Sequence, residues 1–399
     1  MAFGRFVAPL YLRHVLHVNR VEISDSDKVK LEALRGERVV LTPNHPTHDP
    51  VVMFHLSTIL RMQFNWLAAR EVFENPVQGW VAAGAGAYSV DRGSTDTDAL
   101  NTTRRLLKEG KNWLVLFPEG MEHNLHNAVL PFLPGAARLG LGALSDIKDE
   151  TGDLVSLKLV PIALRYSYTA DMRPVMDNAL TRLEHYLNLA NGTHNLGWQE
   201  RLDRISDVVL SVNEEHYGVL PEPDELPAVR LDRLREVVLS RVADSLGVGL
   251  PDPKKPLRNR VRRLMTVTNR RMQEKPRSGG EYAKVLGERR GSWAARLNRE
   301  LRRVMEFVSI KPDIADEPPT VDNFLDVVQR IEIEVFRKWR TFGPRQVLAT
   351  VGEPLDLRDY YVTYQDDADD ASEAAMLEQE NRVIALLKST EHLMTPLPE

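Results

Sequence analysis

Short apolar runs rich in β-branched and aromatic residues alternate with helical stretches over the first 168 residues. The apolar runs have the length of buried strands and lie at 39–43, 64–68, 113–117 and 155–164. The segments between them predict helices over 51–62, 95–110 and 135–144. Strands and helices that alternate in this way predict an α/β fold in which a mostly parallel sheet is wrapped by helices.

The first of these strands ends at Pro43 and is followed by two histidines and an aspartate. Ligands of open α/β sheets bind at the carboxyl ends of the strands, so His45 lies where a functional side chain is expected. An imidazole can take a proton from a hydroxyl near neutral pH when a carboxylate holds its other nitrogen, and Asp49 is the nearest candidate. A structural role is the alternative, because Pro50 suits the first turn of a helix that Asp49 would then cap. The two oxygens of the carboxylate allow both roles.

A second strand end also carries a charged group. The apolar run 113–117 stops at Pro118, Glu119 and Gly120. The glycine-rich segment 84–93 has some features of a dinucleotide-binding loop, but Ser89 stands where the third glycine is required. That interpretation is therefore rejected.

Four short motifs resemble, in order and spacing, the glycerophosphate and lysophosphatidate acyltransferases, the PlsC-like family with a His-Asp motif. They are His45 with Asp49, 86–92, 117–120 and 160–162. The resemblance implies a glycerolphosphate acyltransferase-like fold and an enzyme that transfers a fatty acyl group from an acyl-CoA or acyl-ACP thioester. The implied acceptor is the hydroxyl of a lysophosphatidate-like lysophospholipid, with glycerol 3-phosphate or another lipid as the alternative. No cofactor is implied.

The resemblance also implies roles for individual residues. His45 would be the general base, and Asp49 would orient its imidazole. Arg92 would hold the phosphate of the acceptor, because a guanidinium can bond two phosphate oxygens at once. Glu119 and Gly120 would shape the acceptor pocket.

Two positions depart from the family pattern. Only three residues separate His45 from Asp49, where the family has four, and Met121 and Glu122 follow Gly120 where the family has threonine or serine. Two other functions stay open: a membrane-binding protein on a catalytically degenerate acyltransferase scaffold, and a metal-dependent hydrolase. The hydrolase would take its ligands from His45, His48, Asp49, Glu119, His123 and His126. No established ligand signature is complete, so no metal site is predicted.

The resemblance covers residues 35–168 and reappears near the C-terminus, where 347–356 is similar to the last strand of the family domain and 380–393 to its closing helix. The predicted organisation is an N-terminal amphipathic segment, the first part of an acyltransferase domain, a basic helical insertion, and the last strand with the closing helix. These parts span 1–34, 35–169, 170–344 and 345–399. An acyltransferase domain that ends near residue 168, followed by an independent helical half, is the alternative.

The insertion concentrates positive charge. The 399-residue chain has a net charge of −5, but residues 254–303 hold 17 Lys and Arg against 4 Glu, a net charge of +13. Basic amphipathic helices with an aromatic residue suit an anionic membrane surface. The candidate contacts are Arg262, Arg263, Arg270, Arg271 and Trp293. Pairing of the arginines with the acidic remainder of the chain is the alternative. Nucleic acid is not an expected partner, because no recognised reader motif is present.

The chain has no cysteine, which excludes a thiol nucleophile and disulfides. No apolar run reaches the roughly 18 residues that a membrane span needs. Residues 1–17 lack the features of a signal peptide and would lie on a membrane surface or pack against the core. The expected location is therefore cytoplasmic, with peripheral association to a membrane.

Overall fold

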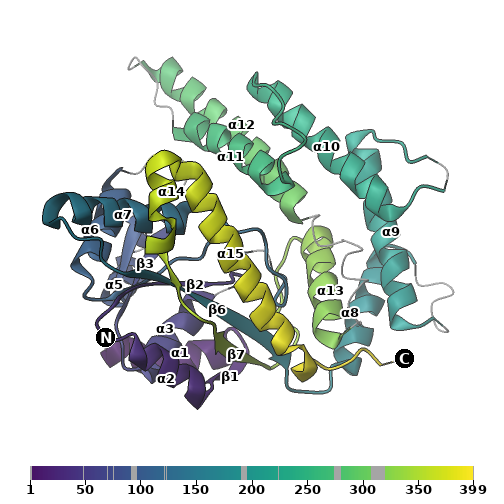
Figure 1. Cartoon of the computed structure of the whole chain (residues 1–399). Coiled ribbons are helices and arrows are strands. Elements are labelled where there is room, and N and C mark those ends of the chain that lie inside the picture. Colours follow the sequence, from purple (N-terminus) through teal and green to yellow (C-terminus); the bar gives the residue numbers. More distant parts are fainter. Residues whose placement is uncertain are drawn as a thin grey trace.

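In the computed structural model, the described part of the chain is built around one β-sheet (Figure 1). The described residues are 2–47, 49–69, 71–74, 76–90, 97–120, 122, 124–189, 196–222, 224–273, 280–306 and 320–398. The strands are β1 (Val18–Ile23), β2 (Arg38–Pro43), β3 (Phe64–Ala69), β4 (Ala87–Val90), β5 (Trp113–Val115), β6 (Leu157–Tyr168), β7 (Arg345–Val351) and β8 (Leu355–Asp356).

Helices precede, separate and follow these strands. The first seven are α1 (Ala2–His14), α2 (Asp25–Ala33), α3 (Asp49–Ile59), α4 (Glu71–Glu74), α5 (Pro76–Gly84), α6 (Thr97–Glu109) and α7 (Gly135–Thr151). The next six are α8 (Arg173–Tyr186), α9 (Trp198–Tyr217), α10 (Pro227–Leu246), α11 (Leu257–Gln273), α12 (Glu281–Glu306) and α13 (Val321–Phe336). The last are η3 (Leu357–Tyr360), α14 (Tyr361–Asp366), α15 (Ala368–Ser389) and η4 (Glu391–Leu393).

The strand order in the sheet is β1-β7-β6-β2-β5-β3-β4, and β8 pairs with β6 outside this path. The pairs of β2 with β5 and β6, of β3 with β4 and β5, and of β1 with β7 are parallel. Only the pairs that β6 forms with β7 and β8 are antiparallel within the described sheet. The prediction of an α/β fold with a mostly parallel sheet is therefore confirmed.

Helices cover both faces of this sheet and bury its apolar side chains. On one face, α1, α2 and α3 contribute leucines and valines such as Leu12, Leu31 and Leu56 to a core with the strands. On the other face, α7 and α15 pack around residues such as Leu141 and Met376. The strands therefore carry apolar residues on both sides, which is why the sequence shows them as continuous apolar runs.

The N-terminal residues contribute a strand that the sequence pattern did not reveal. β1 lies at the edge of the sheet and pairs with β7, although residues 1–34 were expected to precede the domain. Its polar residues Asn19, Arg20 and Glu22 interrupt the apolar pattern, because an edge strand is covered less completely than a central one. Helix α1 turns Leu12 into the core and leaves Leu10 exposed.

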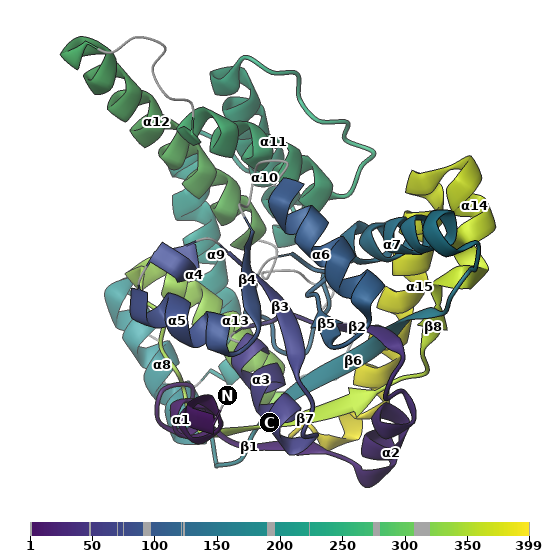
Figure 2. The same cartoon turned by 90° about the vertical axis from the view of Figure 1, so that its left-hand side faces the viewer.

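Six helices, α8 to α13, lie between β6 and β7 in the described residues. They bury two apolar clusters of their own, one centred on α9, α10, α11 and α12 and the other on α8, α9 and α13. Helices α11 and α12 lie side by side and project away from the sheet (Figures 1 and 2). None of the described helices combines the length and hydrophobicity needed to cross a membrane.

Candidate active site

His45 and Asp49 form a hydrogen-bonded pair in the turn between β2 and α3. Nδ1 of His45 lies 3.1 Å from Oδ2 of Asp49, and both residues are buried, with exposed fractions of 5% and 0%. The shortened spacing between them therefore still brings the imidazole and the carboxylate together. Helix α3 begins at Asp49 itself, with Pro50 in its first turn, as the fixed φ of proline favours.

The carboxylate of Asp49 accepts further hydrogen bonds. The backbone N–H of Thr47 donates to Oδ2 at 2.9 Å, and the hydroxyl of Tyr166 donates to Oδ1. Among the described residues, Asp49 has no lysine or arginine as an ion-pair partner. Its charge is stabilised instead by these donors, which a buried carboxylate requires.

Phe117 and Glu119, which follow β5, fix His45 from a second side. The ring of Phe117 stacks on the imidazole with a centroid distance of 4.2 Å. Oε1 of Glu119 accepts from the backbone N–H of His45 at 2.6 Å, and Oε2 accepts from the backbone N–H of Leu130 at 2.8 Å. Glu119 is 1% exposed, so it shapes the site by holding the backbone that carries the histidine.

Gly120 completes this turn with a φ of +73°. A Cβ atom at this position would lie 2.5 Å from Cδ1 of Leu133, so both the backbone conformation and the available space favour glycine. Gly120 thus sets the path of the chain after Glu119.

The hydrogen bonds of His45 to described residues use its Nδ1 and its backbone N–H, and none of them uses Nε2. The hydrogen bond to Asp49 favours the tautomer that carries its proton on Nδ1, which leaves Nε2 as a proton acceptor. The arrangement can therefore serve as a general base toward a hydroxyl that reaches Nε2.

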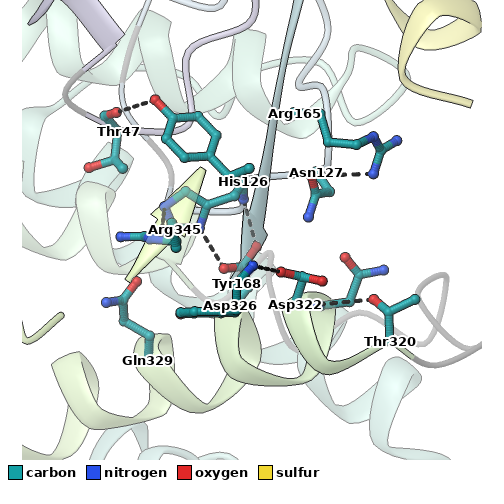
Figure 3. Close-up of polar contacts among 12 residues, drawn as sticks. Thr47, His126, Asn127, Arg165, Tyr168, Thr320, Asp322, Asp326, Gln329 and Arg345 are labelled. Carbon is teal, nitrogen blue, oxygen red and sulfur yellow. Dashed lines mark hydrogen bonds and ion pairs between the residues drawn. The ribbon is translucent and has the colours of Figure 1, made fainter. Parts of the chain in front are cut away.

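A second buried histidine, His126, contacts Asp326 and Arg345 (Figure 3). Nδ1 of His126 is 2.5 Å from Oδ1 of Asp326 on α13, and its Nε2 is 2.5 Å from Nη1 of Arg345 on β7. Burial lowers the pKa of His126, and the charge of Arg345 lowers it further. Because arginine can only donate, His126 is a neutral imidazole whose two nitrogens both have partners.

The structure does not describe three of the candidate residues. Arg92, His48 and His123 lie outside the described residues. Within the described part of the chain, no group of three or more His, Asp or Glu side chains is placed to hold a metal ion. Of the residues considered as ligands, His126 has both nitrogens engaged with protein partners.

The basic residues of the insertion divide into two groups. Arg260 pairs with Glu236 at 2.5 Å and Arg303 with Glu334 at 2.8 Å, so these arginines hold the helices together. The candidate membrane contacts Arg262, Arg263, Arg270 and Arg271 are exposed on α11 and form no ion pair with a described residue. Trp293, the fifth candidate, is half-buried against the apolar core of the insertion. In the described residues of α11 and α12, the exposed aromatic side chain is that of Tyr282 on α12.

The sequence did not single out Tyr166, Asp326 or Arg345 as part of the site. Tyr166 lies beyond the end of the strand predicted over 155–164, because β6 extends to Tyr168. Asp326 and Arg345 contact His126 although they lie 200 and 219 residues after it in the sequence. The spacing of residues in the sequence gives no signal for contacts of this kind.

Comparisons with known proteins agree with this geometry. Residues 20–165 match the family described as Acyltransferase. A 1-acyl-sn-glycerol-3-phosphate acyltransferase from Streptococcus pneumoniae (strain ATCC BAA-255 / R6) is 29% identical over 86 residues, which are 22% of this chain and 32% of that relative. The chain thus matches about a third of the length of this curated relative. No solved structure matches the chain. The family match over residues 20–165 and the relative therefore support the resemblance to the PlsC-like acyltransferases that the four motifs indicate.

Proposed function

We propose that this protein is an O-acyltransferase that moves a fatty acyl group from a thioester donor, acyl-CoA or acyl-ACP, to a hydroxyl of a lysophosphatidate-like glycerophospholipid. The observation that carries the proposal is the buried pair of His45 and Asp49 with Nε2 of the imidazole left without a described partner. The relative from Streptococcus pneumoniae is named for an acceptor of this class, 1-acyl-sn-glycerol-3-phosphate.

In the proposed reaction, Nε2 of His45 takes the proton of the acceptor hydroxyl as its oxygen attacks the thioester carbonyl. The new ester C–O bond forms, the C–S bond breaks, and the departing thiolate takes the proton back from the imidazolium. Asp49 holds Nδ1–H and stabilises the charge of the imidazolium, as the aspartate does in a Ser-His-Asp triad. No covalent intermediate on the protein is required.

Arg92 and the exposed arginines have separate proposed roles. By the family resemblance, Arg92 binds the phosphate of the acceptor through its planar guanidinium. The arginines of α11 attract the protein to an anionic membrane surface, from which the lipid acceptor would be drawn. The support for this second role is that Arg262, Arg263, Arg270 and Arg271 are exposed and unpaired with described residues.

The test is an assay of purified protein with an acyl thioester and a panel of acceptors. The panel contains 1-acyl-glycerol 3-phosphate, glycerol 3-phosphate and lysophospholipids with other head groups, and both thiol release and the acylated product are measured. We expect turnover with the lysophosphatidate-like acceptor and a loss of at least about 100-fold in His45→Ala. Equal turnover by wild type and His45→Ala would show that His45 is not the base. Binding to anionic vesicles without turnover on any acceptor would favour the degenerate scaffold instead.

A further inference from the structure

We propose that Tyr166 is a positioning residue of the site, which fixes the carboxylate of Asp49 so that the carboxylate in turn holds His45. The inference deepens the proposed function, because it names a third member of the unit that would activate the acceptor hydroxyl. The hydroxyl of Tyr166 bonds to Thr47 and Asp49, and no described contact joins Tyr166 to the imidazole of His45 or to the place expected for the substrate. Any effect of Tyr166 on His45 therefore passes through Asp49.

The first step of the argument is how the two oxygens of Asp49 are used. Oδ2 accepts from Nδ1 of His45 at 3.1 Å and from the backbone N–H of Thr47 at 2.9 Å. Oδ1 accepts from the hydroxyl of Tyr166. The hydroxyl of Tyr166 therefore bonds to the carboxylate oxygen that His45 does not contact. The carboxylate cannot rotate about its bond to Cβ without breaking that hydrogen bond.

The second step is that Tyr166 acts as a donor. Its side chain is buried, with an exposed fraction of 2%. Burial raises the pKa of the Tyr166 phenol well above its usual value of 10, and the nearby charge of Asp49 raises it further. The phenol therefore keeps its proton wherever Asp49 is ionised. A hydroxyl donated to a carboxylate is among the stronger hydrogen bonds of proteins, particularly in a buried site.

The third step is that β6 carries Tyr166 to this position. Strand β2 pairs with β6 up to Pro43, which lies opposite Ile162. Asn44 continues the pairing with its side chain, since its Oδ1 accepts from the backbone N–H of Leu164 at 2.7 Å. Strand β6 then extends beyond the end of β2 while it stays paired with β7 on its other side, and Tyr166 is the next residue after Leu164 on the same face. The phenol thus reaches Asp49 from a neighbouring strand that extends beyond β2.

The fourth step is that the tyrosine ring is itself held. The ring of His126 lies 5.0 Å from that of Tyr166, and the guanidinium of Arg345 lies 5.7 Å from the centre of the same ring. His126 and Arg345 hold each other, and Asp326 on α13 holds His126 (Figure 3). Helix α13 is therefore linked to Asp49 through two side chains, those of His126 and Tyr166.

These contacts explain how a motif that is one residue short can keep its geometry. One residue fewer separates His45 from Asp49 than in the family pattern, and the donor on Oδ1 fixes the rotation of the carboxylate in this turn. The titratable and charged groups that face this unit in the described residues are Glu119, Glu122 and His126 from the loop after β5, Arg345 from β7 and Asp326 from α13.

The test compares Tyr166→Phe with Tyr168→Phe in the full chain. Both changes remove one phenol oxygen from the same strand, but no hydrogen bond of the Tyr168 hydroxyl is found among the described residues. The ring titration of His45 is followed by NMR without substrate and assigned with His45→Gln. Without Tyr166 as a donor, the carboxylate of Asp49 is no longer held against Nδ1 and stabilises the imidazolium less, so the pH midpoint of His45 should move downward in Tyr166→Phe and stay unchanged in Tyr168→Phe. An unchanged midpoint in Tyr166→Phe, or the same shift in both variants, would overturn the proposal.

A second readout is the rate of acyl transfer. Tyr166→Phe should lower kcat by about 10-fold to 100-fold, with a much smaller change in KM, because misplacement of a catalytic group acts on the chemical step. The acid limb of the pH–rate profile should move in the same direction as the NMR midpoint. If Tyr166→Phe does not fold, 3-fluorotyrosine at position 166 is the replacement. Its more acidic hydroxyl should move the midpoint downward, and no movement would count against the proposal. The NMR result does not depend on turnover, so a protein without acyltransferase activity could still have this positioning residue.

Discussion

The turn after β2 and the loop after β5 each hold a buried histidine bonded through Nδ1 to a buried aspartate. In the first region His45 lies 3.1 Å from Asp49, and in the second His126 lies 2.5 Å from Asp326. Their exposed fractions are also similar, at 5% and 2%. Burial and a carboxylate partner therefore do not distinguish a candidate general base from a histidine that only joins parts of the fold.

The difference lies on the other side of each ring. Nε2 of His126 accepts a hydrogen bond from Arg345, whereas Nε2 of His45 has no partner among the described residues. An imidazole with both nitrogens bonded joins parts of the fold, and one with a free lone pair can accept a proton from a substrate. The two regions show that the unbonded nitrogen identifies the candidate base.

The largest expected effect is that of Asp49→Asn on the rate. Asparagine is close in size, but it lacks the charge that stabilises the imidazolium and can favour the wrong tautomer of His45. We expect kcat to fall by about 1,000-fold or more, as for the equivalent change in a Ser-His-Asp triad. Thioester turnover and thermal unfolding should be measured on the same preparations. A variant that keeps more than a tenth of the rate would remove Asp49 from the proposed mechanism.

The same substitution in the second region, Asp326→Asn, should act on stability. His126 would lose a charged acceptor, and the nearby Arg345 would remain buried with less negative charge around it. Breaking a buried charged network by changing one member costs about 3–5 kcal/mol, and the amide keeps part of the hydrogen bonding, so we expect a loss of about 3 kcal/mol in the free energy of unfolding. Denaturant unfolding measures it. A loss below about 1 kcal/mol would show that this region does not depend on the pair.

Asp322 lies one helical turn before Asp326 on α13 but has a different environment. Its Oδ1 accepts from the backbone N–H of Tyr168 at 2.8 Å, and its Oδ2 is buried without a hydrogen-bond partner among the described residues. Burial raises the pKa of Asp322 from 3.8 to about 6. The folded protein therefore binds a proton more tightly than the unfolded chain, and this contribution to stability is present below about pH 4 and lost as the pH rises through about 6.

Asp322→Asn should remove this pH dependence. The amide oxygen can still accept from Tyr168, and no charge has to be buried at high pH. At pH 8 we expect the variant to be about 2–3 kcal/mol more stable than wild type, with little difference at pH 4. Urea unfolding at several pH values between 4 and 8 gives the comparison. If the difference in the free energy of unfolding between the two proteins does not change with pH, ionisation of Asp322 in the folded protein costs no stability.

The local part of the site could be predicted from the sequence, and the long-range part could not. His45 and Asp49 belong to one turn, and Glu119 follows a strong apolar run, so strand ends and spacing locate them. Tyr166 and Asp326 reach the site through the length of β6 and the packing of α13, and neither leaves a local pattern.

The same limit applies to the sheet as a whole. Its central strands appear as apolar runs because both faces are covered. Strand β1 is found only through its pairing with β7, which lies more than 300 residues later. Pairing over that distance depends on tertiary packing, which the sequence pattern does not encode.

The smallest expected effect concerns the arginines of the insertion, which divide as the two histidines do into bonded and free groups. Arg270 and Arg271 are exposed on α11 and unpaired with described residues. By contrast, Arg173 at the start of α8 pairs with Asp171, and Arg358 in η3, outside the insertion, pairs with Asp356. Each basic side chain near an anionic membrane adds about 1 kcal/mol of attraction, so Arg270→Gln with Arg271→Gln should weaken binding to vesicles rich in anionic lipid by about 2 kcal/mol, roughly 30-fold.

The matched control for this prediction is Arg173→Gln with Arg358→Gln, which changes the net charge by the same amount outside α11 and α12. Vesicle co-sedimentation at low and at high salt measures both double variants, and the effect on α11 should shrink at high salt because screening weakens the attraction. If the control weakens binding as much as the change on α11, net charge alone accounts for the binding. Loss confined to the α11 variant would mean that the arginines without a described partner form the contact surface, just as the unbonded nitrogen of His45 marks the candidate base.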